Sequence, residues 1–152
     1  MTSEPPIDDV SRAIVEVLQA DGRTSYAALS QQVGLSEAAV RQRVQRLVAD
    51  GVMQVVAVTN PMQMGFHRQA MVAITVRGPV PPVAEALVGL DAVIYVVLVA
   101  GGFDILCEVV ARNDDELLDL LSSRIRTIPG VESTQTLTYL KLAKQTYAWG
   151  AG

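Results

Sequence analysis

The stretch from Ser25 to Asp50 most constrains how this 152-residue chain can fold. Ser25 precedes apolar residues at helical spacing, and Gly34 interrupts that spacing where a left-handed backbone costs little. Ser36 is the expected N-cap of a second helix, and Gly51 marks its end. The stretch therefore predicts two short helices joined by a tight Gly-Leu-Ser turn, which is a helix-turn-helix.

The second of these helices has two contrasting faces. Helical rotation gathers four aliphatic side chains on one stripe, which we expect to be buried: Val40, Val44, Leu47 and Val48. The opposite stripe is polar, with a small residue in its leading turn that permits close approach to base edges. We predict that this face binds double-stranded DNA through seven residues: Ser36, Ala38, Arg41, Gln42, Arg43, Gln45 and Arg46.

An ordinary amphipathic helix with a solvated polar face is the alternative. The composition of the face favours DNA, because it carries three arginines and two glutamines but no lysine. Arginine and glutamine make bidentate hydrogen bonds that suit base edges and phosphates. In the expected arrangement, Arg41 and Arg43 flank the outward face and reach the phosphates on either side of a groove.

The charge of the chain restricts how it can bind nucleic acid. Its net charge of -4 argues against a protein that coats DNA by charge alone. The segment from Ser36 to Ala49 carries three arginines against Glu37, a net charge of +2. DNA binding is therefore expected to be local to this helix.

Other classes of protein are disfavoured by composition. No apolar run approaches the roughly 20 residues of a membrane helix, and the acidic N-terminus lacks the layout of a signal peptide, so we expect a cytoplasmic protein with no membrane partner. The single cysteine, Cys107, excludes an internal disulfide and is expected to be a buried small hydrophobe. Neither a catalytic motif nor a metal-ligand set is present, and His67 is expected to be a surface residue, so we expect no enzyme and no cofactor.

Three domain segments are expected. A helix from Asp8 to Ala20 supports the two helices that follow, which gives a helical DNA-binding domain over residues 1–53. Gln54–Thr59 is rich in β-branched residues and is expected to be a strand, followed by a turn at Asn60-Pro61 and Gly65, so residues 54–69 form a strand and linker. Residues 70–152 form the second domain.

The second domain alternates between strand and helix patterns. The order β-α-β-β-α-β predicts an α+β, ferredoxin-like domain, with a four-stranded antiparallel sheet and both helices on one face. The expected strands are Ala70–Arg77, Val93–Ala100, Ile105–Ala111 and Val131–Leu142, and the expected helices are Pro82–Leu90 and Asp114–Ile128.

The strand from Val93 to Val99 is apolar on both faces. A sheet with helices on one side should leave its other face wet, so something must cover this face. We expect another subunit to cover it, and a loop folding over it is the alternative.

The motifs resemble those of the leucine-responsive and asparagine-responsive regulators, the Lrp/AsnC or feast/famine family. The helical half shows I-D-x-x-x-R-x-I-V-x-x-L-x-x-D-G-R (Ile7 to Arg23) and L-S-x-x-V-G-L-S-x-x-A-V-R-x-R-V-x-R-L-x-x-x-G-V (Leu29 to Val52). The second half shows G-G-F-D (Gly101 to Asp104) and I-P-G-V (Ile128 to Val131). The resemblance implies a winged-helix-like DNA-binding domain and a ligand-sensing domain. It also implies a homodimer that assembles to octamers, with small amino acids bound between subunits.

The same resemblance implies an effector site at the Gly101-Gly102-Phe103-Asp104 loop. Two glycines also suit a tight hairpin, and we expect a positive φ at Gly102. By resemblance, the backbone N–H groups of the glycines receive a carboxylate and Asp104 faces an ammonium group. Thr134 and Thr136 are expected to approach from a neighbouring subunit. Ala100 stands where the family often has a threonine.

The leading hypothesis is a sequence-specific transcriptional regulator that binds DNA through its N-terminal domain and senses a small metabolite, an amino acid, through its C-terminal one. One alternative is a metabolite-binding protein or small enzyme built on the ferredoxin-like half, with the helical half serving assembly. Another is an architectural DNA-binding protein that does not respond to effectors.

Overall fold

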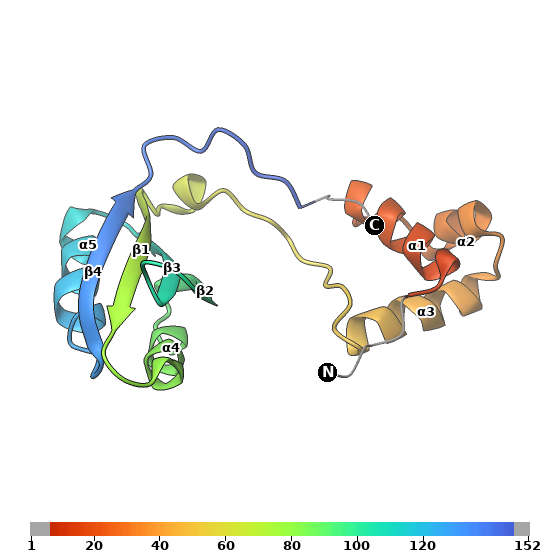
Figure 1. Ribbon diagram of the computed structural model, residues 1–152. Helices are drawn as coiled ribbons and strands as arrows, with labels where there is room; N and C mark the ends of the chain where they lie inside the picture. The colour runs from red at the N-terminus through yellow and green to blue at the C-terminus, as the bar shows by residue number, and fades with distance from the viewer. Residues whose placement is uncertain (1–6, 148–152) are drawn as a thin grey trace. The chain divides into compact units, whose positions relative to one another are not determined.

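The computed structural model describes residues 7–147 of the chain, which divides into two compact units. The first unit comprises the helical part of the chain up to Val58 together with the described residues from Lys144 onward, and the second spans Thr59–Ala143. The first unit contains three helices, and the second contains a sheet with helices packed on it (Figure 1). Across the described part of the chain, no helix has the length and apolarity needed to cross a bilayer.

The first unit contains three helices whose ends are set by local capping. Asp8, Ser25 and Ser36 are the N-caps, and each side chain accepts a hydrogen bond from a backbone N–H in the first turn of its helix, at 2.7, 3.2 and 3.2 Å. Gly34 ends the second helix with a left-handed φ of 69°. The predicted helix-turn-helix is confirmed. The helices are α1 (Asp9–Ala20), α2 (Tyr26–Val33) and α3 (Glu37–Ala49).

The core of the first unit is narrower than predicted. Its buried side chains are Ile14, Val15, Leu29, Val40, Val44 and Leu47. The prediction that Val48 belongs to this stripe is wrong, because its side chain is 44% exposed. The stripe that α3 buries against α1 and α2 consists of Val40, Val44 and Leu47, and Val48 in the last turn is left outside it.

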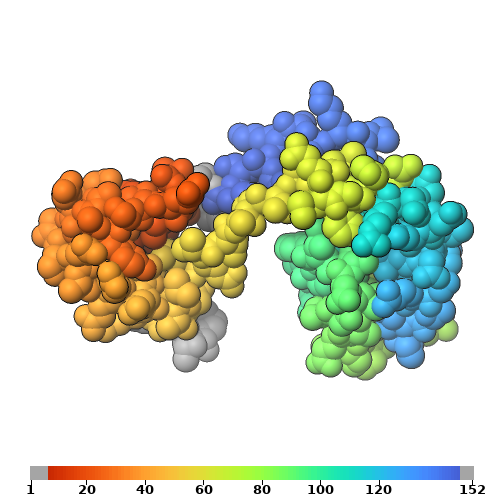
Figure 2. Space-filling model, turned by 180° about the vertical axis from the view of Figure 1, so that it is seen from behind, coloured from red at the N-terminus to blue at the C-terminus, as the bar shows by residue number. Residues whose placement is uncertain are grey.

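An exposed, extended segment follows the first unit. The predicted strand Gln54–Thr59 is wrong, because the segment has no strand pairing and Val55, Val56 and Val58 are all exposed. A β-branched sequence forms a strand only where a neighbouring strand satisfies its backbone, and no described part of the chain supplies one. Figure 2 shows this segment as a narrow stretch of chain, drawn in yellow.

A short 3-10 helix, η1 (Pro61–Met64), forms the predicted turn before the sheet. The Asn60 side chain caps it by accepting a hydrogen bond from the Met62 backbone N–H at 3.0 Å. Gly65 ends it with a φ of 89°, which glycine adopts without strain.

The second unit is a four-stranded antiparallel sheet with its helices on one face (Figure 1). The strand order β2-β3-β1-β4 and the sequence order of the elements confirm the α+β, ferredoxin-like fold. The helix α5 continues as a π-helical turn, η2. The elements are β1 (Arg68–Val76), α4 (Val80–Val88), β2 (Val93–Leu98), β3 (Ile105–Ala111), α5 (Asp114–Asp119), η2 (Leu120–Ile125) and β4 (Val131–Thr138).

The last strand and the last helix end earlier than predicted. β4 stops at Thr138, which pairs with Ala70 of β1. Beyond it the Tyr139 backbone N–H still donates to the Gln69 carbonyl at 2.9 Å, but residues 140–142 do not pair with β1, so the predicted extension to Leu142 is wrong. The helix closes at Ile125 rather than Ile128 after its π-helical turn.

The helix-covered face of the sheet forms the core of the second unit. Alternate strand residues point to α4, α5 and η2, and Cys107 is among them. Burial raises the pKa of the Cys107 thiol to about 11, which confirms it as a buried small hydrophobe. The fully buried side chains of this core include Val72, Ile74, Val83, Leu87, Ile105, Val109 and Ile125.

The other face of the sheet is open. Tyr95 and Leu137 are each 51% exposed on strands at opposite edges, so no loop of the described chain covers them. Val97, two residues after Tyr95 on β2, lies on the same face, opposite Leu106. The apolar character predicted for this face is present, and its coverage by another subunit stays a prediction.

A charged contact joins α3 to the start of α1. Nη1 of Arg43 lies 2.5 Å from Oδ2 of Asp8 and 3.1 Å from Oγ of Ser11. The pKa of the Asp8 carboxyl is lowered to about 2. The hydrogen bond from Arg43 is the largest cause, and the hydrogen bonds from Ser11 add to it. Asp8 thus caps α1 and binds α3 with the same carboxylate.

This contact predicts a pH dependence. Because folding lowers the pKa of Asp8, its contribution to stability is present above its ordinary pKa of 3.8 and is lost as the pH falls toward 2. We expect the melting temperature of the helical unit to fall more steeply between pH 4 and pH 2 in the unmodified protein than in Asp8→Asn, which keeps an N-cap but cannot titrate. Circular dichroism melts at each pH measure this, and parallel profiles would contradict it.

Candidate DNA-binding and effector-binding sites

The outward face of α3 is the candidate DNA-binding surface. Ala38, Gln42, Gln45 and Arg46 are exposed, on the side of α3 opposite its buried stripe. The Arg46 side chain makes no hydrogen bond or ion pair with any residue of the described chain, so its guanidinium is available to an acceptor outside it. Ser36 caps the helix at the same end as Ala38.

Arg41 is exposed but held by neighbours on two helices. Its Nη2 lies 3.3 Å from Oε1 of Glu37, one turn earlier in α3. Its guanidinium carbon lies 5.2 Å from the centre of the Tyr26 ring, within the range of a cation-π contact. The helical spacing of Glu37 and Arg41 reveals the first contact in the sequence. No local signal reveals the second, because Tyr26 belongs to α2.

Arg43 does not flank the outward face as predicted. Its side chain is 35% exposed, and its guanidinium binds Asp8 and Ser11 of the first helix. A helical wheel places Arg43 at the border of the polar face, but only the packing of α1 decides which way the side chain turns. In this structure the Arg43 guanidinium is therefore engaged by residues at the start of α1, and its contact with a phosphate stays a prediction.

The candidate effector loop is a hairpin between β2 and β3, as predicted. The backbone N–H of Val99 donates to the carbonyl of Asp104 at 2.9 Å and closes the loop. Gly101 has a φ of 150°, whereas Gly102 has no positive φ, so the expectation for Gly102 is wrong. Nothing lies within 4 Å of the position of a Cβ at either glycine. The peptide groups of both glycines are therefore open to solvent.

Asp104 anchors this loop to the end of β1. Its Oδ2 accepts a hydrogen bond from the Val76 backbone N–H at 2.8 Å, and its own N–H donates to the Ile74 carbonyl at 3.0 Å. Its Oδ1 has no hydrogen-bond partner within residues 7–147. Phe103 is half-buried beside it. One oxygen of the carboxylate thus fixes the loop, and the other has no hydrogen-bond partner in the described chain.

Thr134 and Thr136 lie on β4, separated from the loop by β1 and β3. They pair with Ile74 and Val72, so they share the helix-covered face of the sheet. Oγ1 of Thr134 accepts a hydrogen bond from Nε of Arg126 at 3.0 Å. A single chain does not bring the two threonines to the loop, and their approach from another subunit stays a prediction.

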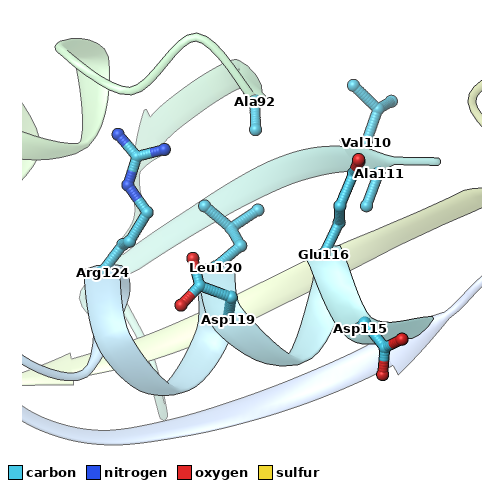
Figure 3. A pocket seen from close by; sticks show the side chains of 8 residues that line it. All are labelled: Ala92, Val110, Ala111, Asp115, Glu116, Asp119, Leu120 and Arg124. Carbon is cyan, nitrogen blue, oxygen red and sulfur yellow. The ribbon is translucent and has the colours of Figure 1, made fainter. Parts of the chain in front are cut away.

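A pocket of about 400 Å³ lies between α5 and the end of β3, at the opposite end of that strand from the effector loop (Figure 3). Glu116 points toward Ala111 and accepts a hydrogen bond from the Arg112 backbone N–H at 2.9 Å. Two acidic residues of the pocket, Asp115 and Glu116, lie in the first turn of α5, where their charge interacts favourably with the helix dipole, and a third, Asp119, is the last residue of α5. No predicted site residue lines it, and the described residues contain no group suited to hold a metal ion.

Two family models match the chain. The AsnC-type helix-turn-helix domain matches residues 7–48, and the Lrp/AsnC ligand binding domain matches residues 69–149. These two segments correspond to the helical unit and the sheet unit described above.

Named relatives match over almost the whole chain. The regulatory protein AsnC of Escherichia coli is 30% identical over 89% of this chain and 91% of its own. The HTH-type transcriptional regulator FL11 of Pyrococcus furiosus is 33% identical over 92% of this chain and 93% of its own.

Solved structures show the same fold. The leucine response regulatory protein LrpA of Mycobacterium tuberculosis has a TM-score of 0.84 and 35% identity, covering 91% of this chain and 96% of its own. A transcriptional regulator from Neisseria meningitidis, solved as a complex with L-Met, has a TM-score of 0.82 at 23% identity, covering 93% and 95%. The matches to both domains and to full-length relatives place this chain in the Lrp/AsnC family of helix-turn-helix transcriptional regulators.

Proposed function

We propose that this regulator reads specific DNA sequences with the outward face of α3 and responds to an amino acid. One observation carries the proposal: the side chains of four residues of α3 are exposed on the face that no other helix of this unit covers. They are Ala38, Gln42, Gln45 and Arg46. A helix presenting glutamine and arginine side chains fits the major groove, where both make bidentate contacts with base edges.

Residues at the start of α3 position the helix on the DNA backbone. Arg41 reaches a phosphate, and the hydroxyl hydrogen of Ser36 is available to a second one while its oxygen caps the helix. A phosphate contact by Arg43 would require its partly exposed ion pair with Asp8 to open. Residues 1–53 therefore act as the DNA-binding domain, residues 54–69 as the connection, and residues 70–152 as the sensing and assembly domain.

The effector site is proposed at the Gly101 to Asp104 loop. The exposed backbone N–H groups of the two glycines suit a carboxylate, and the free oxygen of Asp104 suits an ammonium group. An amino acid carries both groups. The Neisseria meningitidis protein of the same fold, solved with L-Met, supports this ligand class.

Assembly is proposed through the open face of the sheet. Tyr95, Val97 and Leu137 offer apolar surface there, and a second copy can cover it with the same residues in a two-fold dimer. Further association of dimers to octamers would place Thr134 and Thr136 of one subunit near the effector loop of another.

The first prediction tests base recognition. Arg46→Ala and Gln42→Ala should each weaken operator binding by about 1 to 3 kcal/mol while changing the affinity for random DNA much less, because each removes a base-edge contact. Fluorescence anisotropy on an operator found by footprinting and on a scrambled duplex measures both. Arg124→Ala, which removes an arginine from the second unit, should change neither. Equal weakening on both duplexes would assign the two side chains to phosphates.

The second prediction tests the effector loop. Gly102→Val should abolish amino-acid binding without loss of stability, because its φ tolerates a side chain and the new methyl groups fill open space where the ligand would approach. Asp104→Asn should weaken binding while retaining an oxygen for the Val76 N–H. Calorimetry against the common amino acids gives the reference ligand. If both variants bound the amino acid as tightly as the unmodified protein does, the loop would not be part of the effector site.

The third prediction tests the dimer surface. Val97→Asp should reduce the mass of the assembly, because a charge without a partner is costly on a face that becomes buried. Leu118→Asp is the matched control, since it also charges an apolar side chain but on exposed α5. Light scattering measures the mass of each variant. An unchanged mass for Val97→Asp would show that the open face is not the interface.

A further inference from the structure

Two contacts fix the position of Arg41 before any DNA is bound. Tyr26 is the first residue of α2, directly after the N-cap Ser25, and its side chain is half-buried against the core of the helical unit. The Arg41 guanidinium lies over this ring, 5.2 Å from its centre. The ring is therefore a fixed platform, and the arginine above it is 55% exposed.

Such a platform suits an arginine that must bind an anion. A guanidinium stacked on a ring keeps its charge and presents the N–H groups of its edge, and the restraint lowers the entropy lost on binding. Glu37 contacts one of these groups at 3.3 Å, but both side chains are more than half exposed, so the ion pair is weak and a phosphate can replace the carboxylate.

The position of the pair in the helix-turn-helix favours the DNA backbone as the anion. The first helix of this motif crosses the backbone while the second enters the groove. Tyr26 is the first residue of α2, the first helix of the motif, and Arg41 contacts it from α3, the second helix of the motif.

We infer that Tyr26 is a positioning residue for DNA binding: its ring holds the Arg41 guanidinium toward a backbone phosphate. The inference rests on the proposed function of the α3 face. It adds a residue of α2 whose ring acts only through Arg41, and it assigns Arg41 a contact independent of base sequence.

The ring itself is tested by two substitutions. Tyr26→Leu should weaken binding to operator and to scrambled DNA by the same factor, about two- to fivefold, because the cation-π contact is lost at an exposed site. Tyr26→Phe keeps the ring and should bind as the unmodified protein does. If Tyr26→Phe were as weak as Tyr26→Leu, the hydroxyl would be touching the DNA and the inference would be overturned.

The action through Arg41 is tested by the salt dependence and by double variants. Arg41→Gln should flatten the slope of log K against log salt by about 0.9, the value for one phosphate. In a protein that already carries Arg41→Gln, adding Tyr26→Leu should not lower the DNA affinity further. In a protein that carries Arg46→Ala, adding Tyr26→Leu should lower the DNA affinity by the same factor as it does alone. An unchanged slope for Arg41→Gln, or additive losses with Tyr26→Leu, would overturn the inference.

The fold and the stacked geometry are checked separately. Circular dichroism shows whether Tyr26→Leu retains the helical unit. If Tyr26→Leu unfolds, the stacked geometry can still be tested by NMR on the unmodified protein. The Tyr26 ring should then shift the resonances of the Arg41 side-chain protons upfield. The absence of these shifts would overturn the inference. The proposed function and this inference can fail separately. If Arg46→Ala still discriminated operator from scrambled DNA, the proposed base recognition would be wrong. The positioning role of Tyr26 would still stand if its variants behaved as expected.

Discussion

The packing of Val40, Val44 and Leu47 against α1 and α2 is the interaction on which the helical unit depends. These side chains bury one stripe of α3. Because a helix has a fixed rotation per residue, burying that stripe orients every other side chain of α3. The outward set and the inward-turned Arg43 are both consequences of this one contact, and Tyr26 receives Arg41 because α2 lies against the same stripe.

The sheet unit follows a similar division. Its helices cover the middle of one face, where Val72, Ile74 and Val109 are fully buried, while Tyr95 and Leu137 remain half exposed on the other. Each unit thus buries one side in its core and leaves another side exposed. In the helical unit that side is polar, which suits DNA, and in the sheet unit it is largely apolar, which suits another protein surface.

Features set by neighbouring residues were predictable from the sequence, and features set by packing were not. The caps at Asp8, Ser25 and Ser36 are local hydrogen bonds, so the helix starts were correct. The order of strands and helices followed from hydrophobic periodicity in the same way. The outward residues of α3 were predictable too, because the helical period alone separates them from the core. By contrast, Val48, the unpaired segment after Val52 and the orientation of Arg43 depend on which elements meet in space. The Tyr26 contact was missed for that reason.

The lone thiol gives the sheet unit a natural reporter of its own opening. Cys107 is the single cysteine of the chain, has no exposed surface and is deprotonated only with difficulty, its pKa being about 11. A thiol reagent therefore reacts only when the sheet and its helices separate. The helical unit has no cysteine, so the rate of labelling follows the sheet unit alone. The same burial keeps the thiols of two folded copies apart, so oxidising buffers should form no disulfide between them while the sheet unit stays folded.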